Sequence, residues 1–127
     1  MVIYRQAVYR LTIKGAIDWH MNITKYLPLT ESTAYILLSL RQPMHGYGLM
    51  QTVEAMSEGT VKIGPGTLYG AFSTIEGEGL IRMAGQEGRR KVYELTEKGE
   101  SVLDEHIRRM KIFINNGSAP AKGGNEE

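Results

Sequence analysis

The sequence predicts a mainly helical protein that contains one small β-hairpin. Apolar residues recur at spacings of three and four in four segments, which is typical of amphipathic helices. Two strand-like segments, residues 80–84 and 90–95, stand together before the last helical segment. Glycine and proline residues separate most of these segments. With 127 residues, the chain fits one domain and an appendage.

Composition excludes several classes of protein. No apolar run approaches the roughly 20 residues that a membrane-spanning helix needs, and the first residues lack the apolar core of a signal peptide. The chain has no cysteine, and its histidines (His20, His45 and His106) lack metal-site spacing. No nucleophile motif or acid pair is recognisable. We expect a cytoplasmic protein with no membrane partner, metal, cofactor or catalytic residue.

The first two helices are predicted at residues 30–40 and 47–57. Thr30 is placed to cap the first helix, with Glu31 in its first turn. Pro43 and Gly46 then interrupt the helical pattern. The second helix is predicted from apolar residues at spacings of three and four: Tyr47, Leu49, Met50, Val53 and Met56.

The third helix is predicted to begin within the segment IGPGTLYGAF, residues 63–72. Its glycines do not match a dinucleotide-binding loop, because the spacing is wrong and Lys62 interrupts the preceding strand-like residues. Gly64 and Pro65 instead suit a helix start. The apolar face is formed by Leu68, Phe72 and Ile75, and the opposite face by Gly66, Gly70, Ser73 and Gly77. We expect another helix or the wall of a groove to approach this glycine face closely.

The two strand-like segments form a basic hairpin with a projecting tip, the loop 85–89. Thr96 then caps a final helix, predicted at residues 96–114, whose apolar stripe is too broad for a domain of this size to cover. We therefore expect it to bind a second copy of the chain. The predicted dimerisation residues are Leu103, Ile107, Met110, Phe113 and Ile114. Residues 115–127 are predicted to be a disordered tail.

The order helix, helix, helix, hairpin, helix is that of a winged helix-turn-helix at residues 28–95. Five motifs resemble the PadR family of bacterial transcriptional regulators: Leu29-Thr30, His45-Gly46-Tyr47, Pro65-Gly66-Thr67-Leu68-Tyr69, Glu78-Gly79-Leu80, and Gly88 to Thr96 followed by Gly99. The resemblance covers residues 28–113. It implies a homodimeric repressor whose third helix enters the major groove of DNA and whose wing contacts the backbone.

Both the resemblance and the helix-turn-helix pattern indicate the same interface with double-stranded DNA. The predicted DNA-binding residues are His45, Tyr47, Lys62, Gly66, Thr67, Tyr69, Ser73, Arg89, Arg90 and Lys91. A small-molecule effector that changes the dimer geometry is expected to relieve repression. The alternative is a winged helix that binds another protein, which the formal net charge of only +1 favours.

Residues 1–27 lie outside the motifs, and two interpretations of them stay open. Met21 is a natural start for a chain that begins just before the first helix, which would make residues 1–20 a mis-assigned extension. Alternatively, this N-terminal extension is helical and packs on the dimer through Ile3, Tyr4, Val8 and Leu11.

Overall fold

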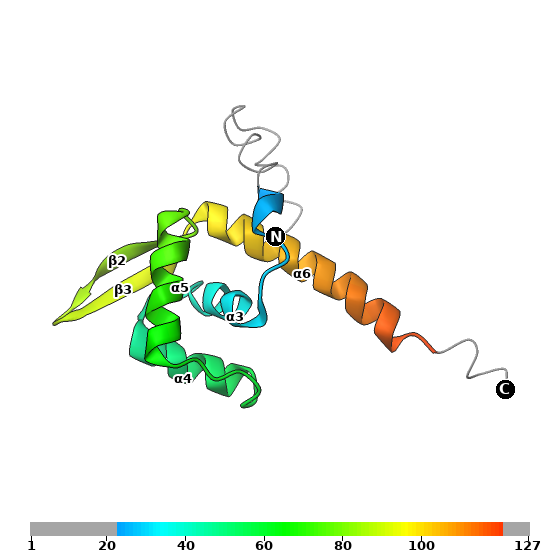
Figure 1. The fold of residues 1–127 in the computed structure, drawn as a ribbon, viewed down its shortest axis with the longest axis horizontal. Helices are drawn as coiled ribbons and strands as arrows, with labels where there is room; N and C mark the ends of the chain where they lie inside the picture. The colour runs from blue at the N-terminus through cyan, green and yellow to red at the C-terminus, as the bar shows by residue number, and fades with distance from the viewer. Residues whose placement is uncertain (1–22, 121–127) are drawn as a thin grey trace, which may run out of the picture.

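The computed structural model describes residues 23–120 (Figure 1). Residues 1–22 and 121–127, on which most of the predicted N-terminal extension and half of the predicted tail fall, lie outside the described residues. The elements in chain order are η1 (Ile23–Tyr26), α3 (Glu31–Ser39), β1 (Met44–His45), α4 (Gly46–Met56), α5 (Pro65–Gly77), β2 (Ile81–Glu87), β3 (Arg90–Leu95) and α6 (Glu97–Ser118). None of these helices is long and apolar enough to cross a membrane.

The predicted helix starts are confirmed. The Thr30 side chain accepts a hydrogen bond from the Thr33 N–H group at the start of α3, and α5 begins with Pro65 after Gly64. Thr96 caps α6 by accepting from the Gly99 N–H group at 3.0 Å. The end of α6 was predicted four residues too early, because the helix continues to Ser118 instead of giving way to a tail at residue 115.

The sheet is larger than the predicted hairpin, because β1 adds a third strand in the order β1-β3-β2. Two residues, Met44 and His45, pair with Tyr93 and Val92 of β3. The wing, which we define as β2 and β3, also has a shorter loop than predicted: β2 runs to Glu87, with an irregularity between Met83 and Gly85. Gly88, with φ of 62°, supplies the left-handed conformation that the tight turn needs.

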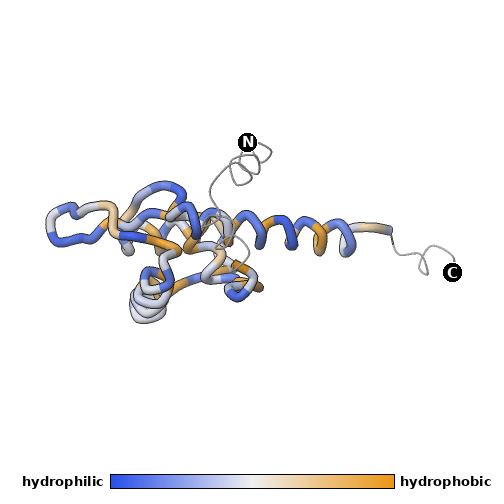
Figure 2. The backbone as a smooth tube through the Cα atoms, turned by 90° about the horizontal axis from the view of Figure 1, so that it is seen from above, coloured by the Kyte–Doolittle hydropathy of each residue, from blue (hydrophilic) through white to orange (hydrophobic). Residues whose placement is uncertain are grey.

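The hydrophobic core lies where α3, α4, α5 and the first half of α6 meet. The wing projects from one side of this body, and the second half of α6 extends from the other side (Figure 1). The core residues are contributed by every one of these elements, among them Leu37 of α3, Leu49 of α4, Leu68 and Phe72 of α5, and Leu103 of α6. Figure 2 shows hydrophobic positions recurring along α6 beyond the body.

A junction at the start of α6 joins the wing to the helical body. The Thr96 N–H group donates to the Leu80 carbonyl oxygen at 3.1 Å, and its hydroxyl group donates to the Gly79 carbonyl oxygen at 2.6 Å. A Cβ atom at Gly99 would collide with the Leu80 carbonyl oxygen and lie 2.7 Å from Leu95 Cδ1. Glycine at position 99 therefore lets α6 pass directly over the start of β2.

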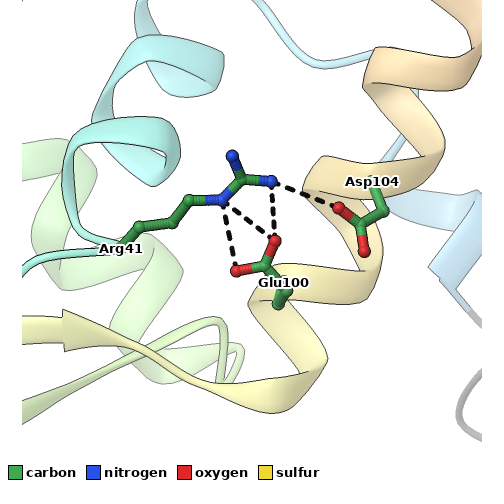
Figure 3. A network of polar contacts seen from close by, with 3 residues as sticks. All are labelled: Arg41, Glu100 and Asp104. Carbon is green, nitrogen blue, oxygen red and sulfur yellow. Dashed lines mark hydrogen bonds and ion pairs between the residues drawn. The ribbon is translucent and has the colours of Figure 1, made fainter. Parts of the chain in front are cut away.

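An ion-pair network holds the end of α3 against α6 (Figure 3). The Arg41 Nη2 atom lies 2.7 Å from Glu100 Oε2 and 3.2 Å from Asp104 Oδ1, and Arg41 Nε also donates to Glu100 Oε2 at 3.0 Å. The side chains are partly exposed, so the network contributes on the order of 1 kcal/mol to stability. Because Arg41 follows α3 and both carboxylates are on α6, the network helps to fix the orientation of α6 relative to α3.

We predict that Gly99→Ala lowers the free energy of unfolding by about 1–3 kcal/mol, because the added methyl group forces β2 and α6 apart. Denaturant unfolding measures the change. Gly117→Ala is the control in the same helix, since no described atom lies within 4 Å of its added methyl group, and it should be neutral or slightly stabilising. Equal stability of the Gly99→Ala variant and the wild type would contradict the tight junction.

Candidate nucleic-acid interface

A hollow of about 350 Å³ opens where the start of α4, the start of α5 and the first half of β3, next to the turn of the wing, meet. Its lining residues are His45, Tyr47, Tyr69, Arg89, Arg90, Lys91 and Tyr93. Six of these seven are predicted DNA-binding residues, and they come from three segments far apart in the sequence. The hollow and the exposed surface of α5 beside it form the candidate interface.

Aromatic packing holds Tyr69 at the edge of the hollow. Its ring meets the Phe72 ring edge-on, with centroids 5.8 Å apart, and Phe72 in turn contacts Tyr93 at 4.6 Å. Tyr69 is nevertheless 53% exposed. A Cβ atom at Gly46 would lie 2.5 Å from Tyr69 Oη, so glycine at the first position of α4 leaves room for this hydroxyl group. Tyr69 thus combines a packed ring edge with a surface that is free to bind.

The glycine face of α5 is open. No described atom lies within 4 Å of a Cβ atom built at Gly66, Gly70 or Gly77. Within residues 23–120, therefore, no second helix approaches this face, and the close approach of a groove wall stays a prediction. Thr67 and Ser73 are exposed on the same helix but do not line the hollow.

The cations of the hollow differ from the other arginines of residues 23–120. Four arginines pair with carboxylates within 4.0 Å: Arg41, Arg82, Arg108 and Arg109. Within the described residues, no carboxylate pairs with Arg89, Arg90 or Lys91. The turn end of the wing therefore presents positive charge that the chain itself does not neutralise, as a site for phosphate groups requires.

His45 contacts both α4 and the wing. Its Nδ1 atom accepts a hydrogen bond from the Gly48 N–H group at 3.1 Å, so His45 caps α4. Its Nε2 atom lies 3.3 Å from Arg90 Nη1, and the Arg90 guanidinium group lies 5.7 Å from the centre of the Tyr47 ring. The sequence predicted that His45 contacts DNA and gave no indication that it caps a helix.

Two residues depart from the predicted set. Lys62 lies outside the hollow, and its ammonium group is 3.8 Å from Glu54 Oε2, although the pair is well exposed. Tyr93 was not predicted, yet it lines the hollow. The alternation of β3 was the available signal, because Lys91 and Tyr93 lie two residues apart on one strand face. Burial, with smaller effects of Glu76 and Tyr69, raises the pKa of Tyr93, which stays protonated.

A second, apolar groove of about 590 Å³ lies between α3 and α6. Tyr35 and Leu38 line one side, and His106, Ile107, Met110 and Ile114 line the other. The predicted dimerisation residues fall into a buried and an exposed group. Leu103 is buried in the core of its own chain, whereas Phe113 is 70% and Ile114 56% exposed. Leu103 therefore belongs mainly to the fold, and the residues beyond it form the unfilled surface.

Comparison with known proteins decides the family. The sequence model described as "Transcriptional regulator PadR-like family" matches residues 35–105, which include α4, α5 and the whole wing. The chain belongs to the PadR-like family of transcriptional regulators. The predicted resemblance is confirmed, as is the expectation of a regulator rather than an enzyme.

Curated relatives match a little more than half of this PadR-like chain. Transcriptional regulator YqjI of Escherichia coli is 29% identical over 73 residues, which are 58% of this chain and 35% of that protein. An uncharacterized 37.1 kDa protein in transposon TN4556 of Streptomyces fradiae is 34% identical over 68 residues, 54% of this chain and 19% of that protein. The chain thus spans about a third or less of the length of these relatives.

Solved structures support the fold. A PadR family transcriptional regulator from Eggerthella lenta matches with a TM-score of 0.56 and 26% identity, over 67% of this chain and 72% of that one. A transcriptional regulator from Clostridium thermocellum gives a TM-score of 0.57 at 23% identity, over 69% and 88% of the two chains. The winged-helix architecture predicted from the order of elements is therefore confirmed.

Two neighbouring groups on α6 of the PadR-like chain, Glu105 and His106, have lowered pKa values. Hydrogen bonding to Arg108, opposed in part by burial and assisted by Arg109, lowers the pKa of Glu105 to about 2. Burial, with a smaller effect of Arg109, lowers the pKa of His106 below its usual 6.5. His106 is 9% exposed, and its buried Nδ1 atom has no hydrogen-bond partner among the described residues. The neutral imidazole is therefore the form that this groove accommodates.

We predict that acidification destabilises the folded chain through His106. Below about pH 6.5 this histidine becomes protonated in the unfolded chain, whereas in the folded chain it stays neutral to a lower pH. The free energy of unfolding therefore falls as pH falls. Denaturant unfolding at one protein concentration, between about pH 7.5 and pH 5.5, should show a smaller decrease for His106→Gln than for the wild type. Parallel pH profiles would contradict the prediction. Protonation of Glu105 lowers the free energy of unfolding further only between pH 4.5, its usual pKa, and about pH 2, its pKa in the folded chain.

Proposed function

We propose that this PadR-like chain is a homodimeric, sequence-specific repressor that binds double-stranded DNA through α5 and the wing. The observation that supports the proposal most directly is the hollow, in which the unpaired wing cations meet exposed side chains at the start of α4 and α5. A winged helix that served only to bind another protein would have no need for positive charge gathered at this point.

The geometry of α5 fits the major groove. Its first turns expose Thr67, Tyr69 and Ser73, and helix-turn-helix proteins read base edges from this part of the helix. Gly66 and Gly70 leave its backbone uncovered, so the helix can approach the DNA closely. Arg89, Arg90 and Lys91 then bind phosphates, which position the protein without reading sequence.

The dimer in this proposal forms through α6. Its second half extends from the body, and the exposed residues Met110, Phe113 and Ile114 continue the apolar side of the α3–α6 groove. Packing with the same stripe of a second copy removes this surface from water. Two copies would then present their α5 helices to half-sites about 34–36 Å apart.

Relief of repression by a small molecule completes the proposal. The α3–α6 groove has the size of ordinary ligand sites and is mostly apolar, with His106 as a polar group on its wall. A ligand that favours one arrangement of the two α6 helices shifts the dimer toward that arrangement and changes the spacing of the DNA-binding surfaces. A regulator of this kind acts in the cytoplasm, where the DNA is.

We predict that Arg89→Glu/Arg90→Glu strongly weakens binding to the DNA upstream of the protein's own gene. Two phosphate contacts are lost and repulsion is added, so affinity falls at least about tenfold and the slope of log K against log salt becomes shallower by about two. Fluorescence anisotropy across a salt series measures both quantities.

The control for this experiment is Lys25→Glu/Lys98→Glu, which changes the net charge equally. Both lysines lie beside the Tyr26 ring and outside the hollow, so the control should lose little affinity. Equal losses in the two variants would mean that only net charge matters. If the wild type forms no specific complex with the upstream DNA at modest salt, the repressor proposal fails in favour of protein binding.

We also predict that Ile114→Glu converts the dimer into a monomer, because an ionised carboxylate cannot be buried in an apolar contact without a partner. Size-exclusion chromatography with light scattering measures the mass. Asn115→Glu adds the same charge one position along, outside the stripe, and should stay dimeric. A dimer that survives Ile114→Glu would place the contact elsewhere on the chain.

A further inference from the structure

We propose that His45 and Arg90 form a preorganised site for one phosphate group in the hollow, with the His45 Nε2–H group and the Arg90 guanidinium group as joint donors. This inference deepens the DNA-binding function proposed above and rests on it, because a DNA duplex supplies the phosphate. It gives His45 a specific role: the residue that caps α4 also holds a phosphate between α4 and the wing.

The protonation of the His45 ring follows from its two neighbours. Donors lie beside both ring nitrogens, the Gly48 N–H group 3.1 Å from Nδ1 and Arg90 Nη1 3.3 Å from Nε2. A neutral imidazole has only one nitrogen that can accept a hydrogen bond. The Gly48 group is fixed by the first turn of α4, whereas the Arg90 side chain is flexible, so Nδ1 is the acceptor. The proton of the neutral ring therefore lies on Nε2.

With the proton on Nε2, two donors face each other. Arg90 has no acceptor atom, so the 3.3 Å contact between Nε2 and Nη1 is not a hydrogen bond in this tautomer. An oxygen that accepts from both groups resolves the conflict, and a negatively charged oxygen does so best, because hydrogen bonds from a guanidinium group to an anion are among the strongest in proteins. The contact is thus arranged for a bound anion.

Surrounding residues favour a phosphate in this position. Arg90 lacks a carboxylate partner among the described residues, and the Tyr47 ring beneath it holds its guanidinium group in place. Lys91 and the Tyr69 side chain line the same hollow, so a further cation and a hydroxyl group lie near the site. Three cationic side chains and no acidic residue line the hollow, which favours an anion over any neutral ligand.

Pairing between β1 and β3 brings the two donors together. His45 pairs with Val92, two residues from Arg90 along β3. A phosphate held by both donors therefore connects the first turn of α4 to the turn end of the wing. We infer that binding this phosphate fixes the wing relative to the start of α4, so that one backbone contact positions both elements at once.

The test uses a variant that separates the two roles of His45. Asparagine caps helices well, so His45→Asn keeps an acceptor for the Gly48 N–H group but has no counterpart of the Nε2–H group. The probe is a duplex of arbitrary sequence at low salt, because phosphate contacts do not depend on sequence. Arg90→Gln is the second variant, and Lys25→Gln, outside the hollow, is the control.

We expect His45→Asn to weaken duplex binding about threefold to tenfold while leaving the salt slope unchanged, because a neutral donor is lost and no counterion is involved. Arg90→Gln should weaken binding and reduce the slope by about one. In the double variant the loss should be smaller than the product of the single losses, since both donors act on one phosphate. Wild-type affinity of His45→Asn, or fully multiplicative losses, would overturn the site.

Nuclear magnetic resonance of ¹⁵N-histidine observes the site directly and separates two sources of phosphate. The chain has three histidines, and His45→Asn assigns the signal of His45. The free protein should show the proton on Nε2, and the duplex should shift this signal. A shift with inorganic phosphate alone would assign the site to free phosphate as well. A proton on Nδ1, or no shift with either probe, would overturn the proposal, whereas loss of specific binding to the upstream DNA alone would overturn only the repressor function.

Discussion

The passage of α6 over the start of β2 is the contact on which the architecture depends. Gly99 lies against the Leu80 carbonyl oxygen, and Thr96 bonds to the same oxygen and to Gly79. These short-range contacts fix where the wing ends and the long helix begins. Thr96 alone separates β3 from α6, so the direction of the helix and the orientation of the wing are set together.

The same junction divides the apolar residues of α6 into two groups. Val102 and Leu103 face the core because the helix lies on α3 there, held by the bonds from Arg41 to Glu100 and Asp104. Beyond this point the body ends and the helix continues, so the described chain covers Met110 and Ile114 only in part and leaves Phe113 70% exposed. One continuous stripe in the sequence therefore serves the fold in its first half and leaves a surface for association in its second.

Local signals predicted the parts of the structure that depend on local chemistry. Thr30, Pro65 and Thr96 mark helix starts because capping involves residues only three positions apart. Contacts between distant segments were missed: β1 exists only because Met44 and His45 find β3 about fifty residues later. The hollow contains both features that were predicted and features that were missed. Its charges could be predicted from composition, whereas Tyr93 and the cap made by His45 depend on packing that no spacing reveals.

These contacts also explain how association and DNA binding could be linked in one small chain. The Leu95 N–H group bonds to the Leu40 carbonyl oxygen at 2.9 Å, so the ends of α3 and β3 and the start of α6 move as one unit. In the proposed dimer, the distance between the two hollows then depends on the angle at which the two α6 helices cross. Because α3 and α6 also form the walls of the apolar groove, the effector that we propose would act on that angle, and through it on the spacing of the DNA-binding surfaces. The groove and the hollow need no direct contact for this effect, since the rigid junction at Thr96 and Gly99 connects them.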